Sequence, residues 1–424
     1  MGRFRPPPGH GRPACLAVLG GTLLAVARDR RAAGPRPQWS LLVWNLAGGK
    51  GGPAPVAAHA FDPGFVPTAL THPPTFVDKV LVGGADGSTQ LWNFVAGAML
   101  HASTVGADAA AAAGPGGGRA APAAVRPALR TMCPAPALDI VALGFANGVV
   151  ALVDVRADVV LTVLRDAAGT GAAAAAAAGP AGAVGAAAGP PLGGAVTALS
   201  FCTAPGAAPL LAVGGAAGCL ALWDLETARL AGVLPHAHAP GSPVTTAHWF
   251  AGEARLLTGG GDNALRQWAL AAGGGGGGAG GSGTPAMAAS LASASAPLTL
   301  LRSRTGHAAP PALVRFYGAD GTRLLSAGSA DRSLRLVSAI QDAQSRELSQ
   351  GPGLGAQARR LRVEVADLKL PRVVALDACP VRFLLFVCLF FFFFFLRGWD
   401  GREKSTHTPH PISFPSAGAL PIGG

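Results

Sequence analysis

Two histidines stand at the same distance before an aspartate, a pairing of residue types that could support metal binding or catalysis. His238 lies 24 residues before Asp262, and His307 lies 24 residues before Asp331. A metal site at this point would use His236 and His238, which are separated by one alanine. Two histidines do not complete a zinc shell, and no third ligand stands at a ligand spacing. The sequence therefore predicts no metal site and no cofactor.

No enzyme motif accompanies these residues. The chain has no serine–histidine–aspartate order of a known kind, no HExxH and no P-loop. The glycines at 214–215 and 259–261 lie inside predicted hairpins rather than between a strand and a helix. They cannot form a phosphate cradle of the usual kind. We expect no catalytic residues and no cofactor-binding residues, and a protein that is not an enzyme.

The elements that position the histidines and aspartates are repeated hairpins. In Leu210–Glu226 a short apolar strand is followed by a tight turn, an alternating strand and a closing Trp-Asp. The turn lies six residues before the closing position in five units: Asp86 before Trp92, Asn147 before Val153-Asp154, Ala217 before Trp223-Asp224, Asp262 before Trp268, and Asp331 before Val337. Trp44-Asn45 is a less regular sixth member. Unrelated hairpins are the alternative, because such turns occur in any β protein, but the agreement of spacing, turn and closing residue favours a repeat.

The length of the unit identifies the repeat class. Trp223 and Trp268 are 45 residues apart, which matches the roughly 40–45 residues of a WD40 propeller blade. The predicted fold class is all-β, an incomplete WD40 β-propeller of about six blade units. In blades of this class a histidine of the inter-blade loop bonds the aspartate of the hairpin turn. We therefore expect structural roles for the repeat positions Asp86, Trp92, Asn147, Asp154, Trp223, Asp224, His238, Asp262, Trp268, His307 and Asp331.

Composition divides the rest of the chain into segments. Residues 1–13 are rich in arginine, proline and glycine, and we expect them to be disordered. Residues 14–378 are expected to form the blades, with alanine- and glycine-rich loop inserts at 106–124, 167–194 and 271–296. Cys15–Val26 is apolar enough to suggest a signal peptide, but its Gly-Gly break and the repeats that follow favour a propeller strand.

Charge and cysteine content restrict the partners and the compartment. The formal net charge of +11 suggests nucleic-acid binding. However, residues 1–36 carry +6 and residues 379–424 carry +2, which leaves +3 for the central chain and no evident basic patch on the blades. The six cysteines form no CxxC motif, and Cys202 and Cys219 lie in apolar strand patterns, as buried free thiols do. A reducing compartment, cytosol or nucleus, is predicted.

The C-terminal segment differs from the repeats. Phe383–Leu396 is a run of fourteen apolar residues with six consecutive phenylalanines, shorter than the roughly twenty residues of a transmembrane helix. Phenylalanine codons are pyrimidine-rich, whereas the preceding chain has the composition of a G+C-rich coding sequence. We therefore interpret residues 379–424 as a tail foreign to the repeats, with a translated intron as the hypothesis. A membrane anchor is the alternative.

Three stretches carry a more specific resemblance. Thr71–Asn93, Gly261–Trp268 and Arg302–Gly318, the last with Arg-x-Arg-x-Gly-His before Tyr-Gly, resemble segments of the family of WD-repeat proteins associated with the U3 small nucleolar RNA. The resemblance covers about residues 40–378. It implies two tandem propellers and a C-terminal helical domain, so a chain of this length is expected to be a fragment.

The resemblance also implies a function. Members of this family are scaffolds of the small-subunit processome, a ribonucleoprotein of the nucleus and nucleolus in which rRNA processing leads to 18S rRNA. The expected role is therefore ribosome biogenesis, with other processome proteins, the U3 snoRNP and the pre-rRNA particle as partners, direct or indirect, and with no membrane. The alternative is a generic WD40 adaptor in an unrelated complex.

Overall fold

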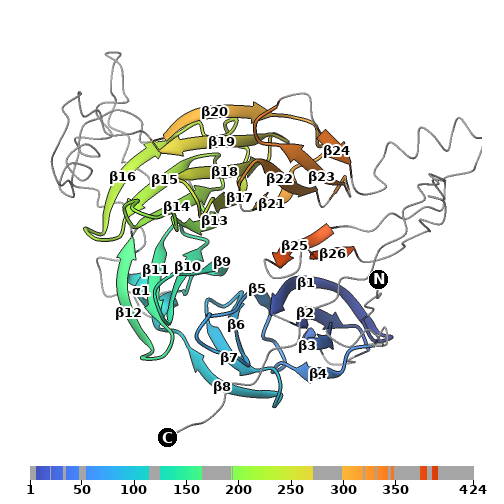
Figure 1. Cartoon of the computed structure of the whole chain (residues 1–424). Helices are drawn as coiled ribbons and strands as arrows, with labels where there is room; N and C mark the ends of the chain where they lie inside the picture. Colours follow the sequence, from blue (N-terminus) through green and yellow to red (C-terminus); the bar gives the residue numbers. More distant parts are fainter. Residues whose placement is uncertain are drawn as a thin grey trace, which may run out of the picture. The chain divides into compact units, whose positions relative to one another are not determined.

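The computed structural model describes residues 6–19, 21–31, 35–46, 54–113, 125–164, 192, 194–270, 298–318, 320–328, 330–331, 333–341, 345–347, 373–379 and 384–389. Over these residues the chain forms six four-stranded antiparallel sheets, one two-stranded sheet and one helix (Figure 1). Most of the predicted inserts 167–194 and 271–296 lie outside the described residues.

Each four-stranded sheet is built from four consecutive strands, so that no strand crosses between sheets. The six sheets are β1 (His10–Leu19), β2 (Thr22–Asp29), β3 (Gln38–Asn45) and β4 (Ala57–Ala60); β5 (Pro67–Thr71), β6 (Lys79–Gly84), β7 (Thr89–Asn93) and β8 (Ala98–Ser103); β9 (Leu129–Pro134), β10 (Ile140–Phe145), β11 (Val150–Asp154) and β12 (Val159–Leu164); β13 (Val196–Phe201), β14 (Leu210–Gly215), β15 (Leu220–Asp224) and β16 (Arg229–Leu234); β17 (Val244–Trp249), β18 (Arg255–Gly260), β19 (Leu265–Leu270) and β20 (Leu298–Arg304); and β21 (Pro311–Tyr317), β22 (Arg323–Gly328), β23 (Leu334–Ser338) and β24 (Ser345–Glu347). We call these sheets blades one to six.

Successive blades contact one another through their first strands. β1 contacts β5, β5 contacts β9, β9 contacts β13, β13 contacts β17, and β17 contacts β21. The fourth strands, such as β8, β12, β16 and β20, lie at the outside (Figure 1). This succession of blades is that of a β-propeller, so the predicted fold class and the expected six blade units are confirmed.

The core lies between neighbouring blades, which explains why the second strands read as continuous apolar runs. Every residue of β14 is buried, because each face of its sheet packs on an adjacent blade. One cluster joins Val150 and Leu152 of blade three to Leu211 and Trp223 of blade four. By contrast, five of the six residues of β8 are exposed. The closing tryptophan of a repeat therefore serves the packing between blades.

The structure differs from the sequence-based expectations at two segment boundaries. β1 begins at His10, which pairs with Asp29 of β2, so the last four residues of the segment expected to be disordered belong to a strand. The insert expected at 106–124 begins as a helix, α1 (Val105–Ala113). Alanine has the highest helix propensity, and Ala107 and Ala110 are buried against blade three.

The two-stranded sheet occupies the position after the sixth blade. β25 (Val373–Cys379) pairs with β26 (Leu384–Leu389), and β25 contacts both β21 and β1 (Figure 1). β26 lies inside the apolar run predicted at Phe383–Leu396, whose last seven residues are outside the described part of the chain. No helix in the described ranges has the length and apolar character needed to cross a membrane.

Candidate functional site in the blade hairpins

The fifth blade places four side chains in one hydrogen-bonded chain. His238 Nδ1 lies 2.8 Å from Asp262 Oδ1, and His238 Nε2 lies 2.9 Å from the hydroxyl of Thr258. The indole Nε1–H of Trp268 donates to the same hydroxyl at 3.0 Å. The inter-blade loop, the second strand and the third strand of this blade are thereby joined through the buried side chains of His238, Thr258 and Trp268, while the Asp262 side chain is 12% exposed.

The turn between β18 and β19 explains why an aspartate stands there. Asp262 Oδ1 accepts from the backbone N–H of Ala264 at 3.2 Å, and Asn263 adopts a positive φ of 62°, which asparagine tolerates. Oδ2 accepts from the N–H of Ala239 at 3.1 Å and pairs with Arg266 at 2.9 Å. A single carboxylate thus closes its own turn and holds the neighbouring loop.

The charge state of this network follows from its burial. Burial lowers the pKa of His238, against the opposing effect of Asp262, so the imidazole is neutral near pH 7. The pKa of Asp262 is also lowered, because hydrogen bonds from His238 and the backbone outweigh the effect of burial. The hydrogen-bond pattern assigns the ring proton to Nδ1, which donates to Asp262, and leaves Nε2 to accept from Thr258.

The sixth blade repeats the arrangement with serine in place of threonine. His307 Nδ1 lies 2.8 Å from Asp331 Oδ2, and His307 Nε2 lies 2.8 Å from Ser326 Oγ. The hydroxyl of Ser333 adds a second contact to the carboxylate at 2.8 Å. Burial acts to raise the pKa of Asp331, but hydrogen bonds from Ser333 and His307 outweigh it and leave that pKa lowered.

The contacts in blade six follow the order of a nucleophile, a base and an orienting carboxylate. A hollow lies beside His307 and Ser326, and its lining includes Leu265, Thr305 and Gly306. Val337 also lines it and takes the position that the larger Trp268 has in blade five. Ser326 faces the hollow, yet none of its surface is exposed to solvent. Because Ser326 has no exposed surface, a substrate does not reach its hydroxyl in this structure. The hydrogen bonds of His307 to Ser326 and Asp331 instead connect the inter-blade loop to the hairpin.

Blade two keeps the turn aspartate and the tryptophan but joins them differently. Asp86 accepts from the backbone N–H and the hydroxyl of Ser88, at 3.1 and 2.7 Å. Trp92 donates to Gln90 of its own strand at 2.9 Å and packs edge-on against Phe61. Among the described residues no histidine joins the two, and Val82 stands where blade five has Thr258.

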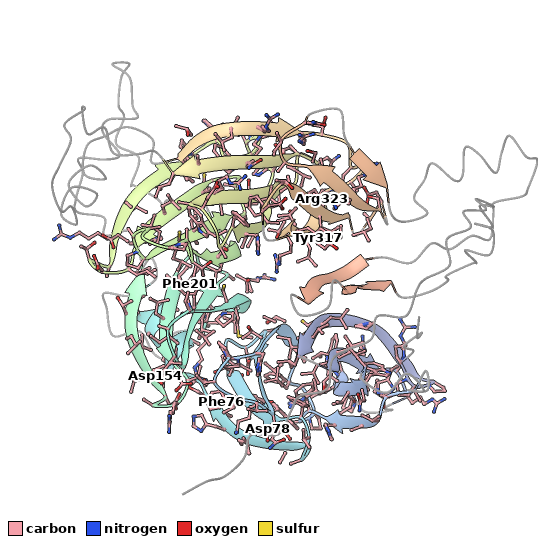
Figure 2. All side chains as sticks on the ribbon, in the orientation of Figure 1. Phe76, Asp78, Asp154, Phe201, Tyr317 and Arg323 are labelled. Carbon is pink, nitrogen blue, oxygen red and sulfur yellow. The ribbon has the colours of Figure 1, made fainter. Side chains whose placement is uncertain are left out.

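Blade three uses its turn residue to hold the helix. Asn147 donates from its side-chain amide to the carbonyl of Ala110 in α1 at 2.9 Å. Asp154 accepts from the backbone N–H groups of Arg156 and Ala157, both at 2.9 Å, and so closes the turn between β11 and β12. Figure 2 labels Asp154 at the outer part of this blade. Here α1 takes the place that the histidine-bearing loop has in blade five.

Blade four has neither an aspartate in its turn nor a histidine partner. The carbonyl of Gly218, at a φ of +91°, accepts from the backbone N–H of His238 at 3.0 Å. Trp223 is buried in the core, and Asp224 accepts from Glu226 N and from the hydroxyl of Thr227, each at 2.9 Å. Among the predicted positions, therefore, the structure joins histidine to aspartate in blades five and six.

Sequence reasoning missed the hydroxyls that complete these networks. Thr258 and Ser326 are the polar residues in the otherwise apolar interior of strands that begin with an arginine, and both have no exposed surface. The corresponding positions of blades two, three and four hold Val82, Leu143 and Val213. A polar residue in the apolar interior of the second strand was the available signal.

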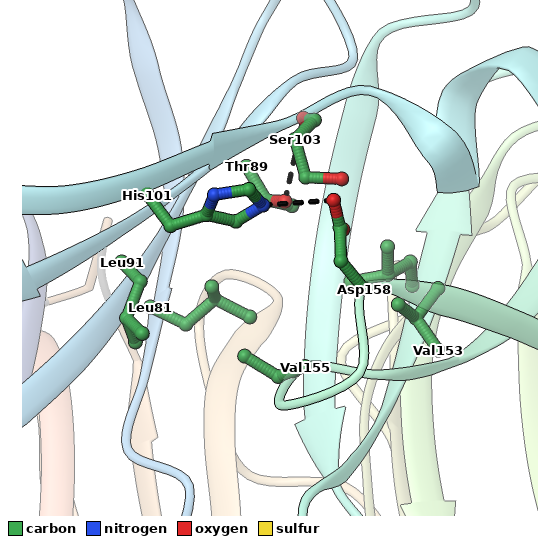
Figure 3. A pocket seen from close by; sticks show the side chains of 9 residues that line it. Leu81, Thr89, Leu91, His101, Ser103, Val153, Val155 and Asp158 are labelled. Carbon is green, nitrogen blue, oxygen red and sulfur yellow. Dashed lines mark hydrogen bonds and ion pairs between the residues drawn. The ribbon is translucent and has the colours of Figure 1, made fainter.

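A further polar contact joins the outer strands of blades two and three. His101 of β8 lies 2.8 Å from Asp158, at the turn before β12, above a pocket lined by Leu81, Leu91 and Val153 (Figure 3). His236, the partner considered for a metal site, is exposed, while both ring nitrogens of His238 are engaged. Within the described residues there is no group of three or more potential metal ligands.

The comparisons with known proteins agree on one family. Residues 35–270 match the family model described as "WDR36/Utp21 first beta-propeller". The "U3 small nucleolar RNA-associated protein 21 homolog" of Schizosaccharomyces pombe is 30% identical over 74% of this chain and 27% of its own length. "WD repeat-containing protein 36" of Homo sapiens is 27% identical over 67% of this chain and 24% of its own length. "U3 small nucleolar RNA-associated protein 21" of Saccharomyces cerevisiae is 29% identical over 58% and 22%. The chain spans about a quarter of the length of these relatives.

Proposed function

The chain belongs to the WDR36/Utp21 first beta-propeller family, and from this membership we propose that it is a non-catalytic scaffold of the small-subunit processome. It supports the processing of pre-rRNA to 18S rRNA and the biogenesis of the small ribosomal subunit. Its place is the nucleus and nucleolus. Its partners are other processome proteins together with the U3 snoRNP.

The observation that carries the proposal is the match to the family model over residues 35–270. Two of the relatives are named for association with the U3 small nucleolar RNA. The hairpin networks support a scaffold, because their histidines, hydroxyls and carboxylates are used to fix loops to strands. Fixed loops present a pre-organised surface, which lowers the entropy cost of binding a partner.

The test is recovery of U3 RNA with an affinity-tagged chain expressed in a eukaryotic cell. U3 RNA is quantified in the eluate relative to U6 RNA, and a tagged WD40 propeller of similar size from an unrelated complex is the control. We expect enrichment of U3 RNA over the control and staining of the nucleolus. Recovery equal to the control, with staining outside the nucleolus, would favour a generic WD40 adaptor instead.

A further inference from the structure

The hairpin between β2 and β3 is longer than the corresponding hairpins of the other blades. Eight residues connect β2 to β3, whereas four connect β6 to β7, β14 to β15 and β18 to β19. Six residue pairs follow the pair Leu23–Trp44 toward the turn, compared with three after Val80–Trp92. Three more pairs, at about 3.3 Å per residue, project this hairpin by roughly 10 Å. We name the described residues 28–31 and 35–38 of this hairpin the arginine arm.

The arginine arm carries an excess of positive charge. Arg28, Arg30, Arg31 and Arg36 are all exposed, and Asp29 is the single acidic residue between positions 28 and 38. Asp29 accepts a hydrogen bond from the backbone N–H of Arg31. None of the four guanidinium groups forms an ion pair with a carboxylate of the described residues. Their charge is therefore available to a partner.

Three of these arginines lie close to glycines. A Cβ at Gly9 would lie 2.3 Å from Arg31 Nε, and Gly9 has a φ of +95°. A Cβ at Gly64, with a φ of +98°, would lie 3.2 Å from Arg36 Cδ. Arg30 lies against Gly11 in the same way, with Nε 3.2 Å from such a Cβ. The missing Cβ atoms leave room for these side chains beside the backbone, and the planar guanidinium fork loses less entropy for each hydrogen bond that it forms.

The character of the arginine arm indicates the class of its partner. Protein interfaces place aromatic or other apolar residues at their centre, but none of the exposed large hydrophobic side chains belongs to the arm. Nucleic-acid interfaces are more polar and more positive, and the arginine fork matches phosphate in a bidentate manner. We propose that the arginine arm binds the phosphate backbone of RNA. The choice of RNA over DNA rests on the function proposed above.

The experiment measures binding of the 424-residue chain to a 5′-fluorescein-labelled 20-nucleotide oligouridine by fluorescence anisotropy across a salt series. In the arm variant, Arg28, Arg30, Arg31 and Arg36 are each changed to Gln. The matched control changes Arg130, Arg156, Arg229 and Arg323 to Gln, which are exposed on blades three, four and six and remove the same charge. Circular dichroism melting verifies that both variants keep the fold.

We expect the arm variant to lose about tenfold or more in affinity and to lower the slope of log K against log salt by about 3, since each phosphate contact to a single strand contributes roughly 0.7. The control variant should stay within about twofold of the original chain. Replacing the four arm arginines by Lys should give intermediate binding, because charge is kept while bidentate contact is lost.

Three results would overturn the proposal. The first is no binding of the oligouridine by the original chain at low salt, and the second is an equal loss of affinity in both variants. The third is displacement of the RNA by polyglutamate at matched charge, which would assign the arm to an acidic peptide. Failure here is distinguishable from failure of the proposed function. Recovery of U3 RNA in cells with an arm that binds no RNA would leave the scaffold function standing. Absence of U3 RNA with the original chain would remove that function whatever the arm binds.

Discussion

Replacing Thr258 by Val removes one hydroxyl and leaves two buried polar groups without a partner. The Nε1–H of Trp268 loses its acceptor at 3.0 Å, and Nε2 of His238 loses its donor at 2.9 Å. Thr258 has no exposed surface, so water does not replace either contact. Each buried group left unsatisfied costs about 1–3 kcal/mol. We therefore expect the opening free energy of blade five to fall by roughly 2–6 kcal/mol.

The same reasoning gives a smaller loss in blade six. Ser326 contacts His307 at 2.8 Å, but the side chain of Val337 has no N–H group to donate to Ser326 as the Trp268 indole does to Thr258. Changing Ser326 to Ala therefore orphans one group rather than two, and the expected loss is about 1–3 kcal/mol. Thr299→Val is the matched control, because Thr299 is an exposed threonine of blade five. It should change the opening free energy by less than about 0.5 kcal/mol.

Native-state hydrogen exchange read by mass spectrometry is the suitable assay. It reports the opening free energy of individual segments, and so does not require that six blades unfold in one step. Peptides covering β18 and β19 report on blade five, and peptides covering β22 and β23 report on blade six. The reasoning is refuted if Thr258→Val has no larger effect than Thr299→Val, or if Ser326→Ala costs as much as Thr258→Val.

Three further outcomes are expected. Burial lowers the pKa of His238 from its ordinary 6.5, so the unfolded chain binds a proton first as the pH falls. The stability contributed by His238 should therefore decline from about pH 6.5 downward in urea titrations. A variant with His238 changed to Gln whose stability declines equally would contradict this. Gly260→Ala would place a Cβ 2.0 Å from the His238 ring and should lower the free energy of unfolding by more than about 2 kcal/mol. In the control Gly241→Ala, the new Cβ has nothing within 4 Å, so the loss should be about 1 kcal/mol because of the positive φ at this position. Asn147→Ala removes the bond to Ala110 and should raise hydrogen exchange in α1 while blade five stays unchanged; equal exchange in α1 would refute the role of that bond.

The sequence predicted the repeated hairpins because their signals are local. Alternation over five residues, a glycine or aspartate turn and a closing tryptophan each act within about fifteen residues of chain, as at Leu210–Glu226. The constant 24-residue spacing also indicated which histidine faces which aspartate, since the strand lengths of a blade fix that distance. The fold class and the two histidine–aspartate contacts were therefore accessible without coordinates.

Other features depended on partners that are distant in sequence. An alanine run beside glycine and proline becomes α1 because blade three buries Ala107 and Ala110. Three arginines lie together on an exposed cationic hairpin, where Gly9, Gly11 and Gly64 leave room for their side chains. Neither propensity nor spacing encodes such contacts.

Turn chemistry and hydrophobic alternation thus determined that this chain folds into propeller blades. Only the tertiary structure decided which hydroxyls complete the histidine networks, where a helix replaces a loop, and that the charge of the first blade projects from one hairpin. The physical reason is the range of the interactions: backbone preferences act between neighbours, whereas burial, hydrogen-bond completion and charge clustering depend on which blades lie side by side.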